Sequence, residues 1–253
     1  MRCFFIKTKK ELRRLLNYNF LEYTNKTISC GEKDLPALYC NTSVYPDFLA
    51  LYGEPSLYHK TDRTCVCFYQ YDKAFDGRNG LYEAIYYNDK KLLKYYKQRF
   101  KGVKFFIEPD YSVFGDIHLI ENEYRLFKAR IVAIWFAVEI GAVVIPNISL
   151  PTERSASFAL DGYENCSVIA ISTKSHLSDK VEYERLIWKI HYVVDNLNLK
   201  AIIVYDVCAD NKIAMECFSY AISKGIEIII PENTMKNRNA LLKECRMAVK
   251  HCG

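Results

Sequence analysis

Short runs of Val, Ile and Phe alternate with helical stretches through most of this 253-residue chain. Runs that are apolar at nearly every position are typical of parallel strands buried on both faces. Strands that alternate with helices predict an α/β fold with a mostly parallel sheet. The predicted strands are Cys65–Tyr71, Val103–Ile107, Ala142–Ile145, Val168–Ile171, Ala201–Tyr205 and Ile226–Ile230.

The intervening stretches have apolar residues at three- and four-residue steps, which predicts amphipathic helices. The clearest pattern spans Glu121–Ile140 and ends at Gly141, a suitable residue for the position after a helix. Four more helices are expected between or after the strands. They are Leu81–Arg99, Lys180–Val194, Lys212–Ser223 and Lys236–Lys250.

The number of strands leaves two architectures open. Six strands suit an open doubly wound sheet, whereas two further apolar runs, Pro36–Tyr39 and Phe48–Leu51, would bring the count to the eight of a (β/α) barrel. Every one of the six ends in a polar residue, which favours an irregular barrel-like arrangement, with the open sheet as the alternative. We expect residues 1–58 to form an irregular segment, with a helix over Lys9–Tyr18, packed on a single α/β domain of residues 59–253.

Polar side chains at the strand ends define the candidate site. In parallel α/β folds ligands bind at the carboxyl ends of the strands. The alternative is that Asp, Asn and Ser there only cap helices and turns. Asp110 is distinctive because Pro109 holds the preceding residue extended, so the carboxylate emerges straight from the strand end. The predicted catalytic residues are Asp110, Asp116 and Asp72, and the predicted ligand-binding residues are Ser112, Asn147, Ser172, Thr173, Arg130 and Asp206.

Several established kinds of site lose support. The chain lacks the GxGxxG, GxxxxGK[ST], GxSxG, HExxH and CxxxCxxC motifs, so dinucleotide, P-loop, hydrolase, zincin and radical-enzyme chemistry are not indicated. Its 10 Cys and 5 His residues show no metal-ligand spacing, so no metal site is predicted. The strand-end carboxylates would nevertheless suit Mg²⁺, and the cofactor stays open.

Charge and hydropathy bear on partners and location. The net charge is +5, and one basic stretch, Lys90–Lys104, has Tyr95, Tyr96 and Phe100 among its lysines. Such a surface could bind nucleic acid through phosphates and stacked rings. We favour an ordinary amphipathic helix with its lysines in water. No signal peptide or membrane span is indicated, so we expect a cytoplasmic protein that does not contact a membrane.

A series of motifs in a fixed order resembles a known family. The series includes an aromatic strand ending at Asp72, the Pro-Asp-Tyr-Ser segment at Pro109–Ser112, and the Val-Ile-Pro-Asn strand at Val144–Asn147. It continues with Gly162 and with the Ser172-Thr173 strand end. The chain thus resembles the prokaryotic family termed domain of unknown function 4417, which occurs in bacteria, archaea, phages and mobile elements. Lys73, Ile117 and Lys174 depart from the family pattern.

The resemblance implies an α/β fold, a phage or mobile-element setting and a site location, but no reaction. Our first hypothesis is therefore a strand-end site that binds, or acts on, a phosphorylated or nucleotide-like ligand. The alternative is an accessory factor without catalytic activity that binds nucleic acid or protein. Whether the chain is an enzyme is left open by its sequence, and so is its partner.

Overall fold

The structure is a computed structural model that describes residues 20–251. The predicted helix over Lys9–Tyr18 lies outside these residues. The strands are β1 (Ser29–Cys30), β2 (Leu35–Pro36), β3 (Phe48–Leu51), β4 (Thr64–Cys67), β5 (Phe105–Ile107), β6 (Val143–Ile145), β7 (Val168–Ser172), β8 (Ala201–Tyr205), β9 (Glu227–Ile229) and β10 (Glu232–Asn233).

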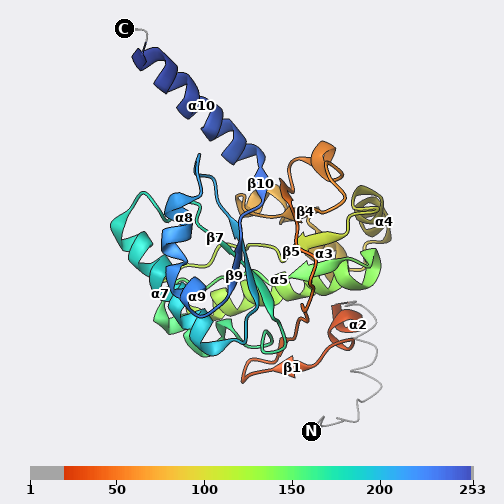
Figure 1. The fold of residues 1–253 in the computed structure, drawn as a ribbon. Helices are drawn as coiled ribbons and strands as arrows, with labels where there is room; N and C mark the ends of the chain where they lie inside the picture. Colours follow the sequence, from red (N-terminus) through yellow and green to blue (C-terminus); the bar gives the residue numbers. More distant parts are fainter. Residues whose placement is uncertain (1–19, 252–253) are drawn as a thin grey trace, which may run out of the picture.

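Helices separate most of these strands, and Figure 1 shows them around a central group of strands. The principal helices are α2 (Phe20–Thr24), α3 (Leu81–Tyr86), α4 (Lys90–Arg99), α5 (Leu119–Trp135), α6 (Ala156–Ala159), α7 (Lys180–Asn196), α8 (Lys212–Cys217), α9 (Ser219–Ser223) and α10 (Thr234–His251). Single helical turns or short segments are η1 (Pro55–Leu57), η2 (Asp72–Ala74), η3 (Phe136–Ile140) and η4 (Glu153–Ser155).

The central strands are parallel, as predicted. One sheet has the order β10-β3-β4-β5-β6, and a second has the order β7-β8-β9. A parallel bridge between Asn147 and Ala170 joins β6 to β7. At the other end, β9 and β10 are consecutive in the chain, separated by Ile230 and Pro231. The pairings therefore run from β3 through β8 and return to β3, which is the cyclic order of a barrel.

A ring contact across the strands shows that the two sheets curl toward each other. Tyr69, which follows β4, stacks on Tyr205 of β8 with 4.6 Å between ring centroids. In a flat sheet four strand spacings would separate these strands by about 19 Å. The strands therefore enclose a common interior, filled on this level by the two rings. This supports the barrel-like arrangement over the open sheet.

The last strand is split because of Pro231. Proline has no amide hydrogen to donate to a ladder, so the strand is interrupted there. β9 pairs with β8, and beyond the proline β10 pairs with β3, where the Glu232 amide donates to Asp47 O at 3.0 Å. Asn233 fastens this join by donating to Asp206 O at 2.8 Å. Phe48–Leu51, which we placed in the N-terminal segment, is thus a strand of the sheet.

The longest predicted helix is present, whereas two others are broken. α5 continues as η3 and ends at Gly141, whose φ of +74° suits glycine. The prediction of one helix over Leu81–Arg99 is wrong, because Asn88 has φ of +54° and Asp89 caps a new helix, α4. The predicted Lys212–Ser223 helix is likewise divided, into α8 and α9.

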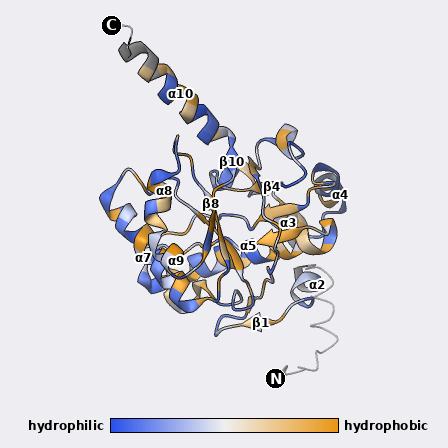
Figure 2. Cartoon of the chain, viewed as in Figure 1, coloured by the Kyte–Doolittle hydropathy of each residue, from blue (hydrophilic) through white to orange (hydrophobic). Residues whose placement is uncertain are grey.

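Apolar residues fill the barrel and the layer between strands and helices. Figure 2 shows hydrophobic strands at the centre and hydrophilic outer faces on α4, α7 and α10. β7 and β8 are buried almost throughout, as expected from their continuous Val and Ile runs. No helix within residues 20–251 is long and apolar enough to cross a membrane.

Candidate functional site

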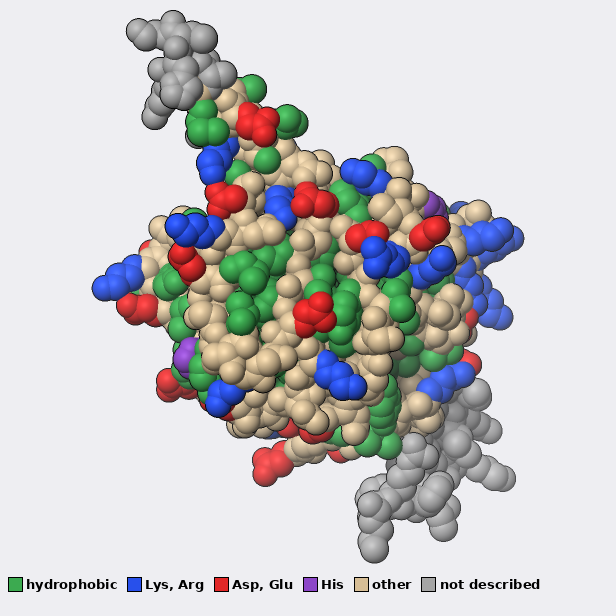
Figure 3. Space-filling model, in the orientation of Figure 1, with side chains coloured by type: hydrophobic (Ala, Val, Ile, Leu, Met, Phe, Trp, Pro, Cys, Tyr) green, Lys and Arg blue, Asp and Glu red, His purple; other side chains and the backbone are tan. Residues whose placement is uncertain are grey.

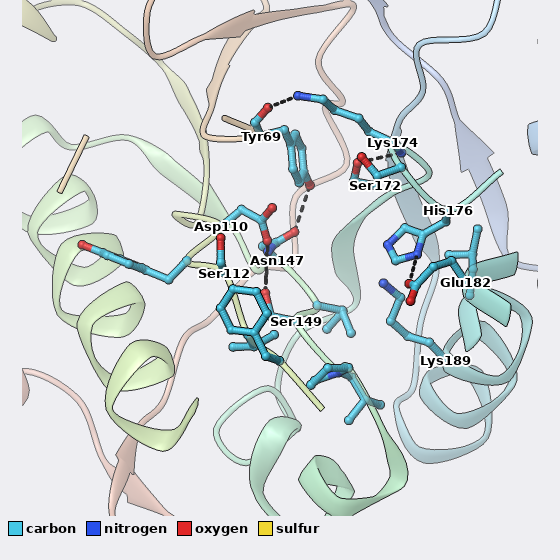
Figure 4. A pocket seen from close by; sticks show the side chains of 18 of the residues that line it. Tyr69, Asp110, Ser112, Asn147, Ser149, Ser172, Lys174, His176, Glu182 and Lys189 are labelled. Atoms are coloured by element: carbon cyan, nitrogen blue, oxygen red, sulfur yellow. Dashed lines mark hydrogen bonds and ion pairs between the residues drawn. The ribbon is translucent and has the colours of Figure 1, made fainter. Parts of the chain in front are cut away.

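A cavity of about 1210 Å³ lies at the carboxyl ends of the strands. Its walls come from the segments that follow β4, β5, β6 and β7, together with one face of α7. Tyr69 lines it, and the Tyr205 ring stacks against Tyr69. Figure 4 shows that side chains from opposite walls point toward the same space. This cavity is where a parallel α/β fold binds its ligands.

Asp110 lies at the centre of one wall. Its Oδ1 accepts hydrogen bonds from Asn147 Nδ2 at 2.7 Å and from Ser149 Oγ at 3.2 Å. The amide of Asn147 is itself fixed, because its Oδ1 accepts from the Tyr69 hydroxyl at 2.9 Å. The segments that follow β4, β5 and β6 thus each contribute to one hydrogen-bonded group (Figure 4). The group orients a carboxylate toward the cavity.

Opposing influences act on the pKa of Asp110. Burial raises the pKa of this carboxyl, although the bonds from Asn147 and Ser149 and the charge of Lys189 oppose the rise. Both hydrogen bonds found among residues 20–251 go to Oδ1, so Oδ2 is left for a ligand. A carboxyl with one oxygen free toward a cavity can accept a proton from a bound ligand or donate one to it.

Lys189 on α7 forms the opposite wall. Lys189 is only 7% exposed, and Figure 4 shows its side chain directed into the cavity. Within the described part of the chain its ammonium group has no hydrogen bond and no ion pair, although the carboxylates of Asp110 and Glu182 act on it at longer range. Burial lowers the pKa of Lys189. A nearly buried cation without a partner costs free energy unless something anionic binds to it.

Other polar groups surround Lys189. His176 Nδ1 lies 3.3 Å from Glu182 Oε2, and burial together with the Lys189 charge lowers the pKa of this imidazole. Lys174 spans toward the other wall and donates from Nζ to Tyr69 O at 2.8 Å. Arg185 also lines the cavity and pairs with Glu182 at 2.6 Å. This wall is therefore mainly cationic, whereas the Asp110 wall offers carboxylate, amide and hydroxyl groups.

The sequence did not point to Lys189, although it contained a signal. Leu186, Ile190 and Val193 of α7 are all fully buried, and Lys189 shares their helix face. A lysine within such an apolar stripe departs from the pattern of a surface helix. Sequence reasoning also missed five other lining residues, because aromatic strands and polar loops are common. They are Tyr69, Ser149, Lys174, His176 and Glu182.

Four of the predicted site residues besides Asp110 line the cavity. Asn147 lies beside Asp110, Ser112 lies on the loop after β5, and Ser172 is the last residue of β7. Asp116 is exposed on the loop before α5, and no hydrogen bond joins it to Asp110.

Asp72 is not among the residues that line the cavity, but it binds Ser112, which is. It accepts from Ser112 Oγ at 2.8 Å and from Ser112 N at 3.1 Å, and pairs with Arg125 at 2.9 Å. Asp72 thereby joins the loops after β4 and β5.

Three predicted ligand-binding residues lie away from the cavity lining. Thr173 donates to Asp206 Oδ1 at 2.5 Å, and both side chains are buried between β7 and β8. Arg130 is fully buried on α5, with its Nε 3.3 Å from Glu108 Oε1. Its guanidinium carbon lies 3.4 Å from the centre of the Tyr163 ring.

Arg130 acts on the site through a chain of contacts. Glu108 Oε2 accepts hydrogen bonds from the backbone N–H of Asn147 at 3.1 Å and from the Tyr163 hydroxyl. The same hydroxyl lies 3.1 Å from Asn147 O. Glu108, Arg130 and Tyr163, here called the Glu108 cluster, therefore fix the backbone of the residue that holds Asp110.

The donor set for a metal is sparse. Among residues 20–251, no group of three or more His, Cys, Asp or Glu side chains is arranged to hold a metal ion. Asp72 is engaged by Ser112 and Arg125, and Asp110 by Asn147 and Ser149.

The basic stretch Lys90–Lys104, for which a nucleic-acid-binding surface was the alternative to an ordinary amphipathic helix, forms α4 and the residues that follow it. Lys90, Lys91 and Lys94 are exposed, and Figure 3 shows Lys and Arg side chains at the edge of the molecule where α4 lies. Of the three rings, Tyr96 and Phe100 are buried in the core. Only Tyr95 is exposed, so this surface does not offer a row of stacking rings.

The sequence matches the profile described as Domain of unknown function (DUF4417) over residues 29–238. The chain belongs to the DUF4417 family. The resemblance drawn from the motifs is thus confirmed, and the matched region of this DUF4417 protein contains the barrel strands and both walls of the cavity. No curated protein and no solved structure matched the chain.

Proposed function

We propose that this DUF4417 protein is an enzyme that acts on a small phosphorylated compound in the strand-end cavity. Lys189 binds the phosphate, and Asp110 transfers a proton on the opposite wall. The observation that carries the proposal is the ammonium group of Lys189, nearly buried and without a partner in the described structure, facing a carboxyl that keeps one oxygen free.

The cationic wall suits a phosphate because its charges are held at fixed positions. Lysine binds phosphate as a point charge, and arginine adds directional donors. Arg185 and Lys174 line the cavity with Lys189, so a phosphate there meets several donors. Each positive charge is worth more in such a partly dehydrated space than on an open surface.

The chemistry on the other wall is proton transfer. Asp110 Oδ2 is available to a ligand hydroxyl, and the raised pKa of the carboxyl places proton exchange closer to neutral pH. Asn147 and Ser149 orient Oδ1 and leave Oδ2 toward the cavity. Phosphate binding and proton transfer thus occupy separate walls, an arrangement that suits a phosphorylated alcohol or sugar.

The alternative of a nucleic-acid-binding accessory factor is less well supported. The Lys90–Lys104 stretch that would form its binding surface has exposed lysines. However, Tyr96 and Phe100 are buried, so two of the three rings that would stack on bases are not available. A phage or mobile-element setting and a cytoplasmic location stay predictions.

A binding experiment tests the phosphate site. Inorganic phosphate, pyrophosphate and ribose 5-phosphate are titrated into the wild-type protein and into Lys189→Met by calorimetry. We expect binding of at least one probe to the wild type and a loss of about 10-fold or more in Lys189→Met, because a charge-assisted hydrogen bond is worth about 1.5–3 kcal/mol. Absence of binding of all three probes to the wild type overturns the proposal.

Two further variants separate the roles of the walls. Lys180→Met makes the same change on the exposed side of α7, where the lysine side chain is 88% exposed, and should bind the probes like the wild type. Asp110→Asn removes a negative charge that faces the anion, so it should bind phosphate as well as the wild type or more tightly. Weaker binding in Asp110→Asn would contradict the assignment of Asp110 to proton transfer.

A further inference from the structure

Two exposed aromatic rings line the mouth of the cavity. Tyr71 is 81% exposed and Phe114 is 45% exposed, and both belong to the cavity lining. The other aromatic side chains of the lining, Tyr69 and Tyr111, are buried. A cation lies over each ring, Lys73 Nζ 5.9 Å from the centre of Tyr71 and the guanidinium carbon of Arg125 5.6 Å from the centre of Phe114. The opposite face of each ring is the surface on which a planar group can stack.

The backbone that carries these rings is held in place. Asn122 of α5 is 1% exposed, and its side chain accepts from Phe114 N at 3.1 Å and donates to Phe114 O at 2.7 Å. Tyr71 immediately precedes Asp72, which binds Ser112 on the loop that carries Phe114. The two rings therefore sit on a pair of loops that are fastened to each other and to α5.

The cavity thus has a direction. The rings follow β4 and β5, which are neighbouring strands, whereas Lys174, His176 and Lys189 follow β7. Asp110, Asn147 and Ser149 lie between these two ends, on the loops after β5 and β6. A ligand that satisfies all three regions carries a planar ring at one end, hydroxyl groups in the middle and an anion at the other end.

We infer that the ligand is a nucleotide, with its base against Tyr71 and Phe114 and its phosphate against Lys189. The inference rests on the proposed phosphate site and adds the class of compound. The ribose hydroxyls then lie at Asp110 and Ser149, where they exchange hydrogen bonds with the carboxylate oxygen and the serine hydroxyl. A cavity of about 1210 Å³ has room for a molecule of this size.

The test compares ligands that share the phosphate and differ in the base. AMP, GMP, CMP and ribose 5-phosphate are titrated into the wild type and into the double variant Tyr71→Ala/Phe114→Ala. We expect at least one nucleotide to bind the wild type about 5- to 150-fold more tightly than ribose 5-phosphate, since stacking on an aromatic ring is worth about 1–3 kcal/mol per base. The double variant should lose this gain and bind ribose 5-phosphate unchanged.

The outcomes distinguish the inference from the proposed function. If ribose 5-phosphate and all nucleotides bind the wild type equally, the nucleotide assignment fails and the phosphate site stands. If no compound binds, both fail. Tyr39→Ala provides the control, because Tyr39 is 55% exposed and is not part of the cavity lining. A loss of nucleotide binding in Tyr39→Ala as large as in the double variant would overturn the stacking site.

Discussion

At the scale of single residues, Lys189 is the most informative side chain of the site, because it is nearly buried on an apolar helix face. Burial lowers the pKa of Lys189, and the carboxylates that attract it, Asp110 and Glu182, do not form an ion pair with it in the described structure. Stability alone would favour an apolar side chain among Leu186, Ile190 and Val193. Residues that reduce stability in this way are found where function requires them.

Lys189→Met is therefore expected to stabilise the protein in the absence of ligand. Methionine keeps the length of the side chain and removes a buried charge, so the free energy of unfolding should rise by about 0.5–2 kcal/mol. Loss of the attraction to Asp110 offsets part of this gain. Urea unfolding followed by circular dichroism measures the change.

The same measurement on Lys180→Met supplies the baseline, because that lysine is exposed and its removal should change stability by no more than about 0.5 kcal/mol. If Lys189→Met instead lowers the free energy of unfolding by more than the baseline, Lys189 has a structural role.

At the scale of elements, the Glu108 cluster links α5 to the end of β6. Arg130 is the charge that compensates Glu108, and Glu108 holds the backbone of Asn147. Burial raises the pKa of Glu108 in spite of the Arg130 charge, the hydroxyl of Tyr163 and the amide of Asn147, which all lower it. A helix thereby sets the position of a strand-end side chain without contacting the cavity.

Arg130→Met is expected to destabilise the protein strongly at neutral pH. A carboxylate left in the core without its partner costs about 3–5 kcal/mol. Removal of Arg130 raises the folded-state pKa of Glu108 further, so the folded protein binds a proton more readily than the unfolded chain. The deficit should therefore be largest at neutral pH and shrink as the pH falls toward the ordinary glutamate value of 4.5.

Chemical unfolding of Arg130→Met at several pH values checks this dependence. The double variant Glu108→Gln/Arg130→Met has no buried charge in this cluster and should be more stable at neutral pH than Arg130→Met alone. A deficit of equal size at all pH values would show that lost packing of Arg130 against Tyr163, and not the charge, determines the effect.

Much of the element structure could be predicted from sequence. The continuous Val and Ile runs of β7 and β8 predicted buried parallel strands, and Gly141 marked the end of the long helix correctly. Leu81–Arg99 was not recognised as two helices, because its apolar pattern continues across the turn at Asn88. That turn depends on a single residue with positive φ, which periodicity does not reveal.

The candidate site was predicted only on one wall. Asp110 and Asn147 were recognisable because they follow strands directly, and polar strand ends are expected to converge. Lys189 comes from the middle of a helix, where a lysine ordinarily lies in water. Arg130 also comes from the middle of a helix, where an arginine ordinarily lies in water. Only the packing of α5 shows that it is buried against Glu108.

At the scale of the whole molecule, the barrel is closed by a very short pairing. Glu232 and Asn233 of β10 pair with Phe48 and Leu49 of β3, and Asn233 also accepts from Lys236 N at 2.9 Å. The remainder of α10 leaves the body, and residues 241–245 are exposed (Figure 1). Closure therefore depends on the first residues of this C-terminal region and not on its distal part.

Truncation tests this division. A chain that ends at Ala240 keeps β9, β10 and the start of α10, so its melting temperature should lie within a few degrees of the wild type. A chain that ends at Gly225 lacks the last strand, leaves β3 and β8 unpaired at their edges, and should lose cooperative unfolding. Thermal unfolding followed by circular dichroism compares the two. A cooperative transition in the shorter chain would contradict the closed barrel.

The position of the closing pair also determines when the fold can be completed during synthesis. Phe48 is made early, whereas its partner Glu232 is made only after all of the other described strands. Contacts between such distant parts of a chain form slowly. Throughout that interval the edge of β3 is open to pairing with other chains, so slow or interrupted translation late in the sequence should favour aggregation.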